Sequence, residues 1–271
     1  MEHDISLEWD SGPTADLRPP TEVYASIGLP HPEPEAAAAA GPGAPIGTIR
    51  ARQAGRLLGW VTLYGDGESR VGAQGERADR LARRLVRGAH VGDPPPSAEE
   101  RAAAVGMYRE AAEQARSAGA RILHWSGTDT APEGNAARAL GARVTGEIAR
   151  IWTVDPRTWW APGGLPAVRV RALSAPRVGV IGEGAELTAD VAGSRAYTNA
   201  AEAITAPGVT ADILGAVLAE LVELLRRTHP DVTELAVFEF DADPEGAVRH
   251  ALPRAGLRIE HRLLDFELPL T

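Results

Sequence analysis

The sequence contains no cysteine and no lysine, and only 5% of its residues are aromatic. The absence of cysteine excludes disulfide scaffolds, thiolate metal sites and cysteine nucleophiles. No apolar run reaches the ~18 residues that a membrane span needs, so the sequence offers no candidate span. The first ten residues, MEHDISLEWD, are acidic and lack the apolar segment of a secretory signal, so we expect a cytoplasmic protein.

The charge balance limits the kinds of partner. All 28 basic residues are arginines, they face 37 acidic residues, and the formal net charge is -9. Clustered cations dominate nucleic-acid binding, so this balance disfavours nucleic acid as a partner. We therefore expect neither nucleic acid nor a membrane as a partner. The length of 271 residues favours two domains or one large one, because a typical domain has ~100–200 residues.

The first half begins irregularly. Within residues 1–45, which are rich in proline and glycine, we expect one strand and one short helix. Two β-rich runs, 46–53 and 56–66, predict a hairpin that turns at Ala54 and Gly55.

A long helix is predicted over residues 97–120. A capping box of Ser97 and Glu100 marks its start, and Gly119 marks its end. Residues 76–88 have the apolar spacing of a helix, although a strand there would suit the fold proposed below.

The rest of the chain alternates strands and helices. Further strands are expected at 121–127, 147–155, 168–173, 185–193, 194–204, 233–240 and 256–268. Short helices are expected from Pro132 and from Pro244, and an amphipathic helix is expected over 210–227. Composition shifts to proline, glycine and paired tryptophans at 158–167, which we interpret as a linker between domains 1–157 and 168–271.

The two halves end in the same order of elements. Each has a long helix, a strand, a polar turn, a Pro-Glu-Gly sequence, a glycine and a closing strand. The Pro-Glu-Gly sequences begin at Pro132 and Pro244, and the glycines that follow are Gly141 and Gly256. We interpret this order as an internal duplication.

The duplicated tail, residues 108–147 and 218–261, resembles the C-terminal half of the GNAT superfamily of acyl-CoA-dependent N-acyltransferases. The resemblance implies an α/β fold of tandem GNAT-like domains, with mixed, splayed β-sheets flanked by helices. It implies transfer of an acyl group from the co-substrate, acetyl-CoA or another acyl-CoA, to a small-molecule amine. We expect the chain to act as a monomer or homodimer. In this fold the pantetheine arm enters the gap between two parting strands, and the pyrophosphate binds at the start of the long helix, a natural anion site.

The resemblance also indicates where the phosphates would bind. In the first half the nearest fit is Arg101, Ala104 and Gly106, with alanine where the family has its first glycine. Two glutamates in the first helical turn would repel a pyrophosphate there. In the second half the nearest fit is Gly208, Val209 and Thr210, with only Asp212 nearby. We therefore favour the second half, or the groove between the halves, as the active region.

The catalytic residues differ from the family pattern. Its usual acid is a tyrosine four residues before the glycine turn, where this chain has Ala137 and Leu252. On the strand before the second long helix, Glu202 is the candidate base, alone or through water, and Tyr197 accompanies it. The imidazole of His250 suits a proton shuttle, since the ordinary pKa of histidine is ~6.5. Glu202 as a solvated strand residue and His250 as a surface residue are the alternative interpretations.

Three further residues are candidates for substrate binding: Asn199, Asp241 and His124. Asp241 belongs to an acidic group, with Glu239, Asp243 and Glu245, that could bind an amine or a divalent ion or form a charged turn. A packing residue is the alternative interpretation of His124. The spacing of the acidic group fits no standard calcium loop, so no metal is expected. Because both phosphate loops and both tyrosines depart from the family, two alternative functions stay open. One is a catalytically degenerate protein that binds a small molecule or partner, and the other is a CoA-independent biosynthetic enzyme.

Overall fold

The structure is a computed structural model. It describes residues 4–11, 20–31, 43, 45–67, 69–87, 95–173, 177–240 and 246–271. The chain divides into two compact units: unit 1 comprises Met1–Glu147 and Leu264–Thr271, and unit 2 comprises Ile148–Leu263. None of the helices in the described ranges is long and apolar enough to span a membrane.

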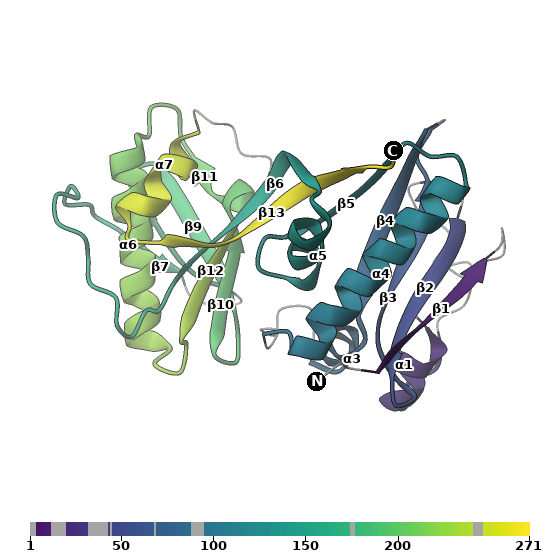
Figure 1. Cartoon of the computed structure of the whole chain (residues 1–271). Helices are drawn as coiled ribbons and strands as arrows, with labels where there is room; N and C mark the ends of the chain where they lie inside the picture. Colours follow the sequence, from purple (N-terminus) through teal and green to yellow (C-terminus); the bar gives the residue numbers. More distant parts are fainter. Residues whose placement is uncertain are drawn as a thin grey trace. The chain divides into compact units, whose positions relative to one another are not determined.

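Unit 1 is built on a mixed sheet (Figure 1). Its strands follow the order β1 (Ile5–Ser11), β2 (Pro45–Gln53), β3 (Arg56–Gly65), β4 (Arg70–Arg77), β5 (Ile122–Thr128) and the end of β13 (Arg258–Pro269). The strands β1 to β4 pair antiparallel, whereas β4 and β5 are parallel. The predicted hairpin is confirmed, since β2 and β3 turn at Ala54 and Gly55, both with positive φ.

The parallel strands β4 and β5 part after a short pairing. Residues 70–72 of β4 pair with residues 122–124 of β5. Beyond this register β4 continues to Arg77 alongside β3, and β5 continues to Thr128. The splayed pair expected from the sequence is therefore present in unit 1.

Four helices of unit 1 are described: α1 (Thr21–Ser26), α3 (Ala78–Arg87), α4 (Ala98–Ser117) and α5 (Pro132–Leu140). The buried face of α4 is mostly alanine, with Met107 and Tyr108 as its large members, so the helix lies close to the sheet. Both predicted ends of α4 are confirmed: Ser97 and Glu100 form the capping box, and Gly119 adopts a positive φ of 84°.

Unit 2 repeats this plan (Figure 1). Its strands follow the order β6 (Arg143–Val154), β12 (Glu234–Phe240), β10 (Arg195–Asn199), β9 (Ala185–Ala192), β8 (Val178–Gly182) and β7 (Arg171–Leu173), and β11 (Ile204–Thr205) pairs with β9. The helices are α6 (Ala211–Thr228) and α7 (Ala247–Arg254), with the 3-10 turn η2 (Ala200–Glu202) between β10 and β11. The strands β10 and β12 are parallel and pair along all of β10.

Each unit has its own apolar core. In unit 2, α6 supplies Leu214, Val217, Leu221 and Leu225, all at most 1% exposed. In unit 1, Trp125 of β5 contacts Tyr108 of α4 and Phe266 of β13. The predicted α/β class, with duplicated halves and mixed sheets flanked by helices, is confirmed by this topology.

Several expected elements differ in detail. Residues 78–87 form helix α3. The strand β4 before it was not predicted, because its glycines weaken the strand signal of the sequence. The strand expected over 194–204 ends at Asn199, because the Asn199 side chain accepts a hydrogen bond from the amide of Ala201 and starts the turn η2. The second short helix is described from Ala247.

The units are not simple successive segments of the chain. The expected linker, 158–167, lies within unit 2, and the chain changes units inside β6 and again inside β13. The boundaries at 157 and 168, which were drawn from composition, stay a prediction.

Candidate functional site

A small apolar cavity lies at the carboxyl end of the parallel pair in unit 2. It has about 20 Å³ of free volume, and β9, β10, β12, α6 and α7 line it. Its lining residues are Leu187, Thr188, Thr198, Asn199, Ala200, Ala203, Leu214, Leu218, Leu221, Val237, Val248, Ala251 and Leu252. Ligands of open α/β sheets bind beyond the carboxyl ends of parallel strands, so the position suits a substrate.

The start of α6 lies after a glycine turn. Gly208 has a φ of 88°, and the amide of Val209 donates to the carbonyl of Ala206. Thr210 is the N-cap, and its hydroxyl accepts from the amide of Ile213 at 3.3 Å. The acidic residue of the first turn, Asp212, is paired with Arg254.

Because Arg254 neutralises Asp212 at 2.5 Å, the positive end of the α6 dipole faces no uncompensated carboxylate from its own first turn. The predicted phosphate residues Gly208, Val209 and Thr210 therefore lie in a turn that leads into a helix start. This arrangement is compatible with binding an anion.

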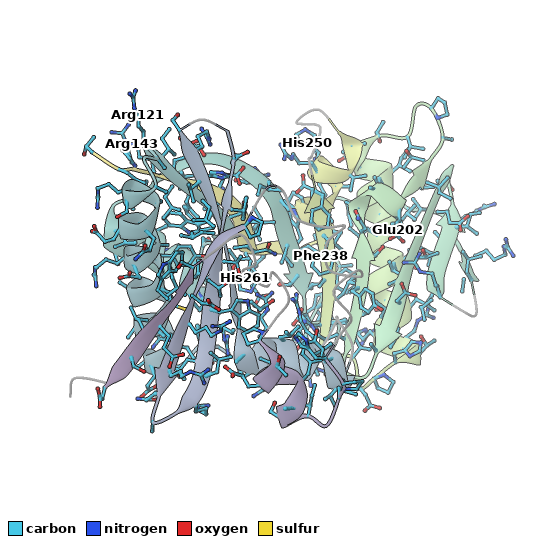
Figure 2. The ribbon with its side chains drawn as sticks, turned by 90° about the vertical axis from the view of Figure 1, so that its right-hand side faces the viewer. Arg121, Arg143, Glu202, Phe238, His250 and His261 are labelled. Carbon is cyan, nitrogen blue, oxygen red and sulfur yellow. The ribbon has the colours of Figure 1, made fainter. Side chains whose placement is uncertain are left out.

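The candidate base Glu202 lies on η2, just beyond the end of β10 (Figure 2). Its carboxylate pairs with Arg177 at 2.6 Å, and its side chain is 47% exposed. Arg177 also pairs with Asp190 at 3.1 Å, and its hydrogen bond with Glu202 is the main cause that raises the pKa of the guanidinium. Glu202 is thus a solvent-accessible carboxylate whose position is fixed by its ion pair with Arg177.

Two other predicted residues come from β10. Asn199 lines the cavity, and its Oδ1 accepts from the amide of Ala201 at 2.9 Å. Tyr197 is half-buried and lies two residues before it. Of the residues on β10, Thr198 and Asn199 line the cavity and Tyr197 does not.

The remaining predicted residues of the second half lie around α7. His250 is exposed on α7, and its carbonyl accepts from Arg254 (Figure 2). Leu252, at the position of the family tyrosine, is 1% exposed and lines the cavity, so an apolar side chain takes the place of the acid. Asp241 lies outside the described residues.

The start of α4 in unit 1 is organised differently. Ser97 Oγ accepts from the amide of Glu100 at 3.1 Å, and the Glu100 carboxylate accepts from the amide of Ser97 at 2.7 Å. Arg101 donates to the carbonyl of Pro96, whereas Ala104 and Gly106 lie farther inside the helix, where amides bond to carbonyls one turn back. The two predicted glycine-loop positions therefore lie in regular helix.

His124 lies on β5 in the section that pairs with β4. Its Nε2 is 2.8 Å from the Asp66 carboxylate, and its ring meets Tyr64 edge-on at 6.4 Å. These contacts place it at the amino end of β5, away from the end where β4 and β5 part. Among the described residues His124 thus contacts Asp66, just after the end of β3, and does not line either cavity.

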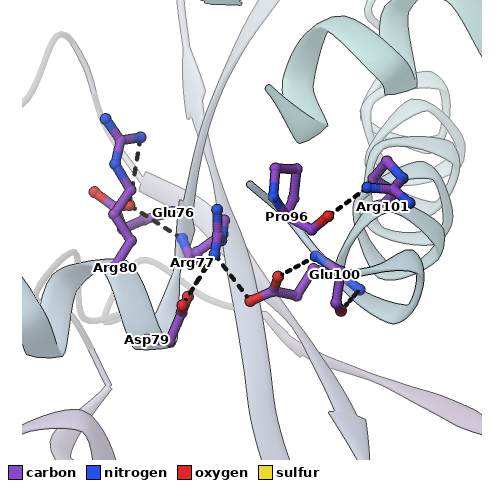
Figure 3. Close-up of polar contacts among 8 residues, drawn as sticks. Glu76, Arg77, Asp79, Arg80, Pro96, Glu100 and Arg101 are labelled. Carbon is purple, nitrogen blue, oxygen red and sulfur yellow. Dashed lines mark hydrogen bonds and ion pairs between the residues drawn. The ribbon is translucent and has the colours of Figure 1, made fainter. Parts of the chain in front are cut away.

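A second cavity lies in unit 1, where β4 and β5 have parted. Its lining comes from β3, β4, α4 and the start of α5, and consists of Leu58, Gly59, Trp60, Val61, Gly75, Glu76, Arg77, Glu100, Ala103, Ala104, Met107, Tyr108, Pro132 and Glu133. Figure 3 shows the polar contacts at its rim: Arg77 pairs with Asp79 at 2.9 Å and with Glu100 at 3.2 Å, and Glu76 pairs with Arg80.

Sequence reasoning missed the buried carboxylates. Among the described residues two glutamates are buried, one in each unit: Glu133 at 8% exposure and Glu239 at 3%. Glu239 accepts from Trp152 Nε1 at 2.5 Å and from Arg249 at 2.6 Å. A buried charge is tolerated when it is paired, so these contacts account for Glu239 as a structural group.

In the part of the chain that the structure describes, no side chain pairs with the Glu133 carboxylate in this way. Burial raises the pKa of this carboxyl above its ordinary value, with opposing effects from its own backbone amide and from Arg80. Tyr108, which lines the same cavity, is 1% exposed, and burial raises the pKa of its hydroxyl, while a hydrogen bond from the backbone of Gly75 opposes that rise. A helix-start glutamate and a mid-helix tyrosine carry no sequence signal of this kind, so only the structure identifies them.

Comparisons with known proteins give distant similarities. No protein-family model matches the chain, and no curated protein matches it. Among solved structures it is similar to a GCN5-related N-acetyltransferase from Sphaerobacter thermophilus, at 10% identity and a TM-score of 0.45, over 97% of this chain and 96% of that one. A tandem GNAT protein from the clavulanic acid biosynthesis pathway is 14% identical, with a TM-score of 0.43, over 98% and 99%.

An acetyltransferase of the GNAT family from Colwellia psychrerythraea is 12% identical, with a TM-score of 0.42, over 82% and 85%. At such values the similarities carry no weight of their own, and the fold assignment rests on the strand order and connections described above. In the described ranges no group of three or more histidine, aspartate or glutamate side chains could hold a metal ion.

Proposed function

We propose that the chain is an acyl-CoA-dependent N-acyltransferase that acylates a small-molecule amine in unit 2. The observation that carries the proposal is the position of the apolar cavity. It lies where the parallel strands β10 and β12 end and where α6 begins. In the GNAT resemblance this is where the thioester and the pyrophosphate of the co-substrate meet the protein.

The residues of unit 2 suit such a co-substrate better than those of unit 1. The start of α6 has one first-turn acid, Asp212, which is paired with Arg254, and its N-cap Thr210 accepts from one amide. The start of α4 carries two acids, Glu99 and Glu100, and a capping box. A pyrophosphate is attracted to the positive end of a helix dipole and repelled by carboxylates. The apolar lining of the unit 2 cavity also suits an acyl chain and its thioester.

The acyl-CoA supplies an activated carbonyl. The amine nitrogen attacks that carbon, the C–S bond breaks, the nitrogen gives up a proton, and the departing thiolate takes one. In this proposal Asn199, whose Oδ1 is engaged with Ala201, uses Nδ2 to donate to the thioester oxygen. Glu202 receives the amine proton through water, since Arg177 already holds its carboxylate. His250 on α7 protonates the thiolate.

Titration calorimetry with acetyl-CoA tests the first step of this proposal. We expect saturable binding near micromolar affinity, and an absence of heat at millimolar acetyl-CoA would overturn it. Ala203→Leu fills the cavity of unit 2 and should abolish binding, whereas Ala104→Leu fills the cavity of unit 1 and should leave it intact. Equal losses in both variants, with both still folded, would contradict the assignment to unit 2.

The second step is tested by turnover. Glu202→Gln should lower turnover while acetyl-CoA binding stays unchanged. The matched control is Glu223→Gln, which removes another arginine-paired carboxylate of unit 2, one paired with Arg226 at 2.8 Å. If Glu202→Gln and Glu223→Gln turn over equally, Glu202 has no part in proton transfer.

A further inference from the structure

The first strand of unit 1, β1 (Ile5–Ser11), lies at the end of its sheet (Figure 1). All seven residues of β1 pair with β2, and within the described ranges no strand pairs with the other side of β1. Five of the seven residues are exposed, so this outer side faces solvent. The backbone N–H and C=O groups along such an edge can pair with a strand of another molecule.

The usual protection of an edge strand is weak in β1. Edge strands of soluble proteins commonly carry lysine, proline or uncompensated charge, whereas β1 contains neither lysine nor proline. Its two acidic residues are offset by arginines of β2. Glu8 pairs with Arg52 at 3.0 Å, and Arg52 also pairs with Glu22 of α1 at 2.6 Å. Asp10 pairs with Arg50 at 3.4 Å. The acids of β1 therefore repel a second strand less than unpaired carboxylates would.

Leu7 is the centre of a symmetric pattern of polarity in β1. Successive side chains of a strand point to opposite faces, so Ile5, Leu7 and Trp9 share one face. Ser6 and Glu8 share the other face. The order apolar, polar, apolar, polar, apolar is the same when it is read in either direction. An antiparallel pair of identical strands requires this symmetry, because each residue meets one that lies equally far from the centre of the second strand.

Leu7 is also the most exposed of the three apolar residues. Ile5 and Trp9 pack against the core of unit 1, and the Trp9 ring covers Gly47 of β2, where a Cβ would lie 2.3 Å from it. Leu7 is 39% exposed, and its neighbour on α4 is Gly106, which offers no side chain to cover it. A second strand beside β1 would bury this leucine against its own counterpart, and that burial favours pairing.

Polarity selects one antiparallel register. Residues that lie directly opposite share a face, so an odd residue meets an odd one and an even residue meets an even one. When Leu7 lies opposite Leu7 of the second copy, Ile5 meets Trp9. In the same register Ser6 meets Glu8. The Ser6 hydroxyl can then donate a hydrogen bond to the Glu8 carboxylate of the second copy, once from each strand.

The neighbouring registers bring like charges together within the strand pair. A shift in one direction places Glu8 opposite Glu8 of the second copy, and a shift in the other direction places Asp4 opposite Glu8. Like charges directly opposite each other destabilise a strand pair. In the register centred on Leu7 the acids that meet are Asp4 and Asp10. Both lie outside Ile5–Trp9, so the pairing can end before them.

We propose that β1 is a dimerisation edge, at which two copies of the chain pair antiparallel through Ile5–Trp9 with Leu7 at the centre. The pair continues the sheet of unit 1 across a two-fold axis. The occupant is a second copy because the edge is self-complementary: each strand supplies both the Ser6 donor and the Glu8 acceptor that the other one needs. A pairing of five residues buries a small area, so the dimer is weak and forms at high protein concentration. The proposal does not depend on acyl transfer in unit 2.

Sedimentation equilibrium of the full chain over about 1–300 µM tests for the dimer, because this range spans the affinity of weak interfaces. The mass should rise with concentration from 28.6 kDa toward twice that value. Leu7→Lys places two like charges at the centre of the pair and should stay at the monomer mass. The matched control is Leu29→Lys, which replaces another leucine of unit 1, 42% exposed, and should associate like the wild type. A wild type that stays monomeric, or two variants that associate equally, overturns the proposal.

Disulfide trapping tests the register. The chain has no cysteine, so Leu7→Cys and Ser11→Cys each introduce a single thiol. Directly opposite residues have Cα atoms ~4.5–5.5 Å apart, within the range of a disulfide. The two Ser11 positions would lie eight residues apart along the pair, roughly 27 Å. Under the same mild oxidation, Leu7→Cys should form the linked dimer at least about tenfold faster than Ser11→Cys, which is exposed on the same strand. Equal rates overturn the proposal, and this comparison decides alone should Leu7→Lys fail to fold.

Discussion

The last eight residues of the chain, 264–271, complete the core of unit 1, and Phe266→Ala tests this directly. Phe266 is 4% exposed and packs on Trp125, with ring centroids 5.8 Å apart. Truncating a buried phenylalanine to alanine costs about 3–5 kcal/mol of unfolding free energy. A unit of this size has roughly 5–15 kcal/mol in total, so the loss is a large share. The expected drop in Tm is roughly 6–20 °C.

Thermal unfolding followed by the indole N–H signals measures the effect unit by unit. In the Phe266→Ala variant the Trp125 signal should disappear at lower temperature, while the Trp152 and Trp159 signals of unit 2 keep their wild-type midpoint. Arg258→Ala is the control, since Arg258 lies on the same strand, is exposed, and belongs to unit 2. A Phe266→Ala chain whose Trp125 signal melts with the wild type would refute the role given to the final residues.

Three further predictions follow from unit 1. Burial raises the pKa of Glu133 in the folded state, so the free energy of unfolding falls as the pH rises from the ordinary value of 4.5 through the folded-state pKa. Urea titrations should therefore find Glu133→Gln more stable than wild type at neutral pH and equally stable below pH 4.5. Ser97→Ala should cost about 1 kcal/mol by loss of the cap, and Ser97→Thr should cost less; equal losses would contradict the capping role. Gly75→Ala should cost about 1–3 kcal/mol, because its Cβ would lie 2.7 Å from the Tyr108 hydroxyl. Adding Tyr108→Phe should restore much of that loss, and simple additivity of the two effects would refute the clash.

The sequence predicted those elements whose signals are local. The capping box at Ser97, the positive-φ stop at Gly119 and the hairpin turn at Ala54 and Gly55 all depend on a few adjacent residues, and all are confirmed. The duplicated order of helix, strand, short helix and strand was also predictable, because amphipathic spacing and turn residues mark each element.

Strand β4 shows why other elements were missed. Gly72 and Gly75 weaken its strand signal, yet a side chain at Gly72 would collide with the Tyr64 ring at 2.1 Å. Glycine is required at these positions because side chains of other secondary-structure elements pack closely against the backbone of β4. Such a requirement cannot be read from local propensity.

The site residues were harder to predict for the same reason. The family pattern drew attention to Glu202, which the structure places in an exposed pair with Arg177. Glu133 was recognised as part of a repeated Pro-Glu-Gly sequence, but its burial depends on Gly127 and Trp125 of a neighbouring strand. Whether a carboxylate is solvated or buried is set by tertiary contacts, and so is its chemistry.

The membership of residues 264–271 in unit 1 has a consequence for biosynthesis. Unit 1 is nearly all translated by Glu147, but 116 residues, 148–263, are made before its last segment. At roughly 5–20 residues per second the ribosome needs about 6–23 s for them. During that interval Trp125 and its neighbours lack Phe266 and Leu270 as packing partners. The nascent first unit is therefore exposed to chaperones and proteases until residues 264–271 have been made.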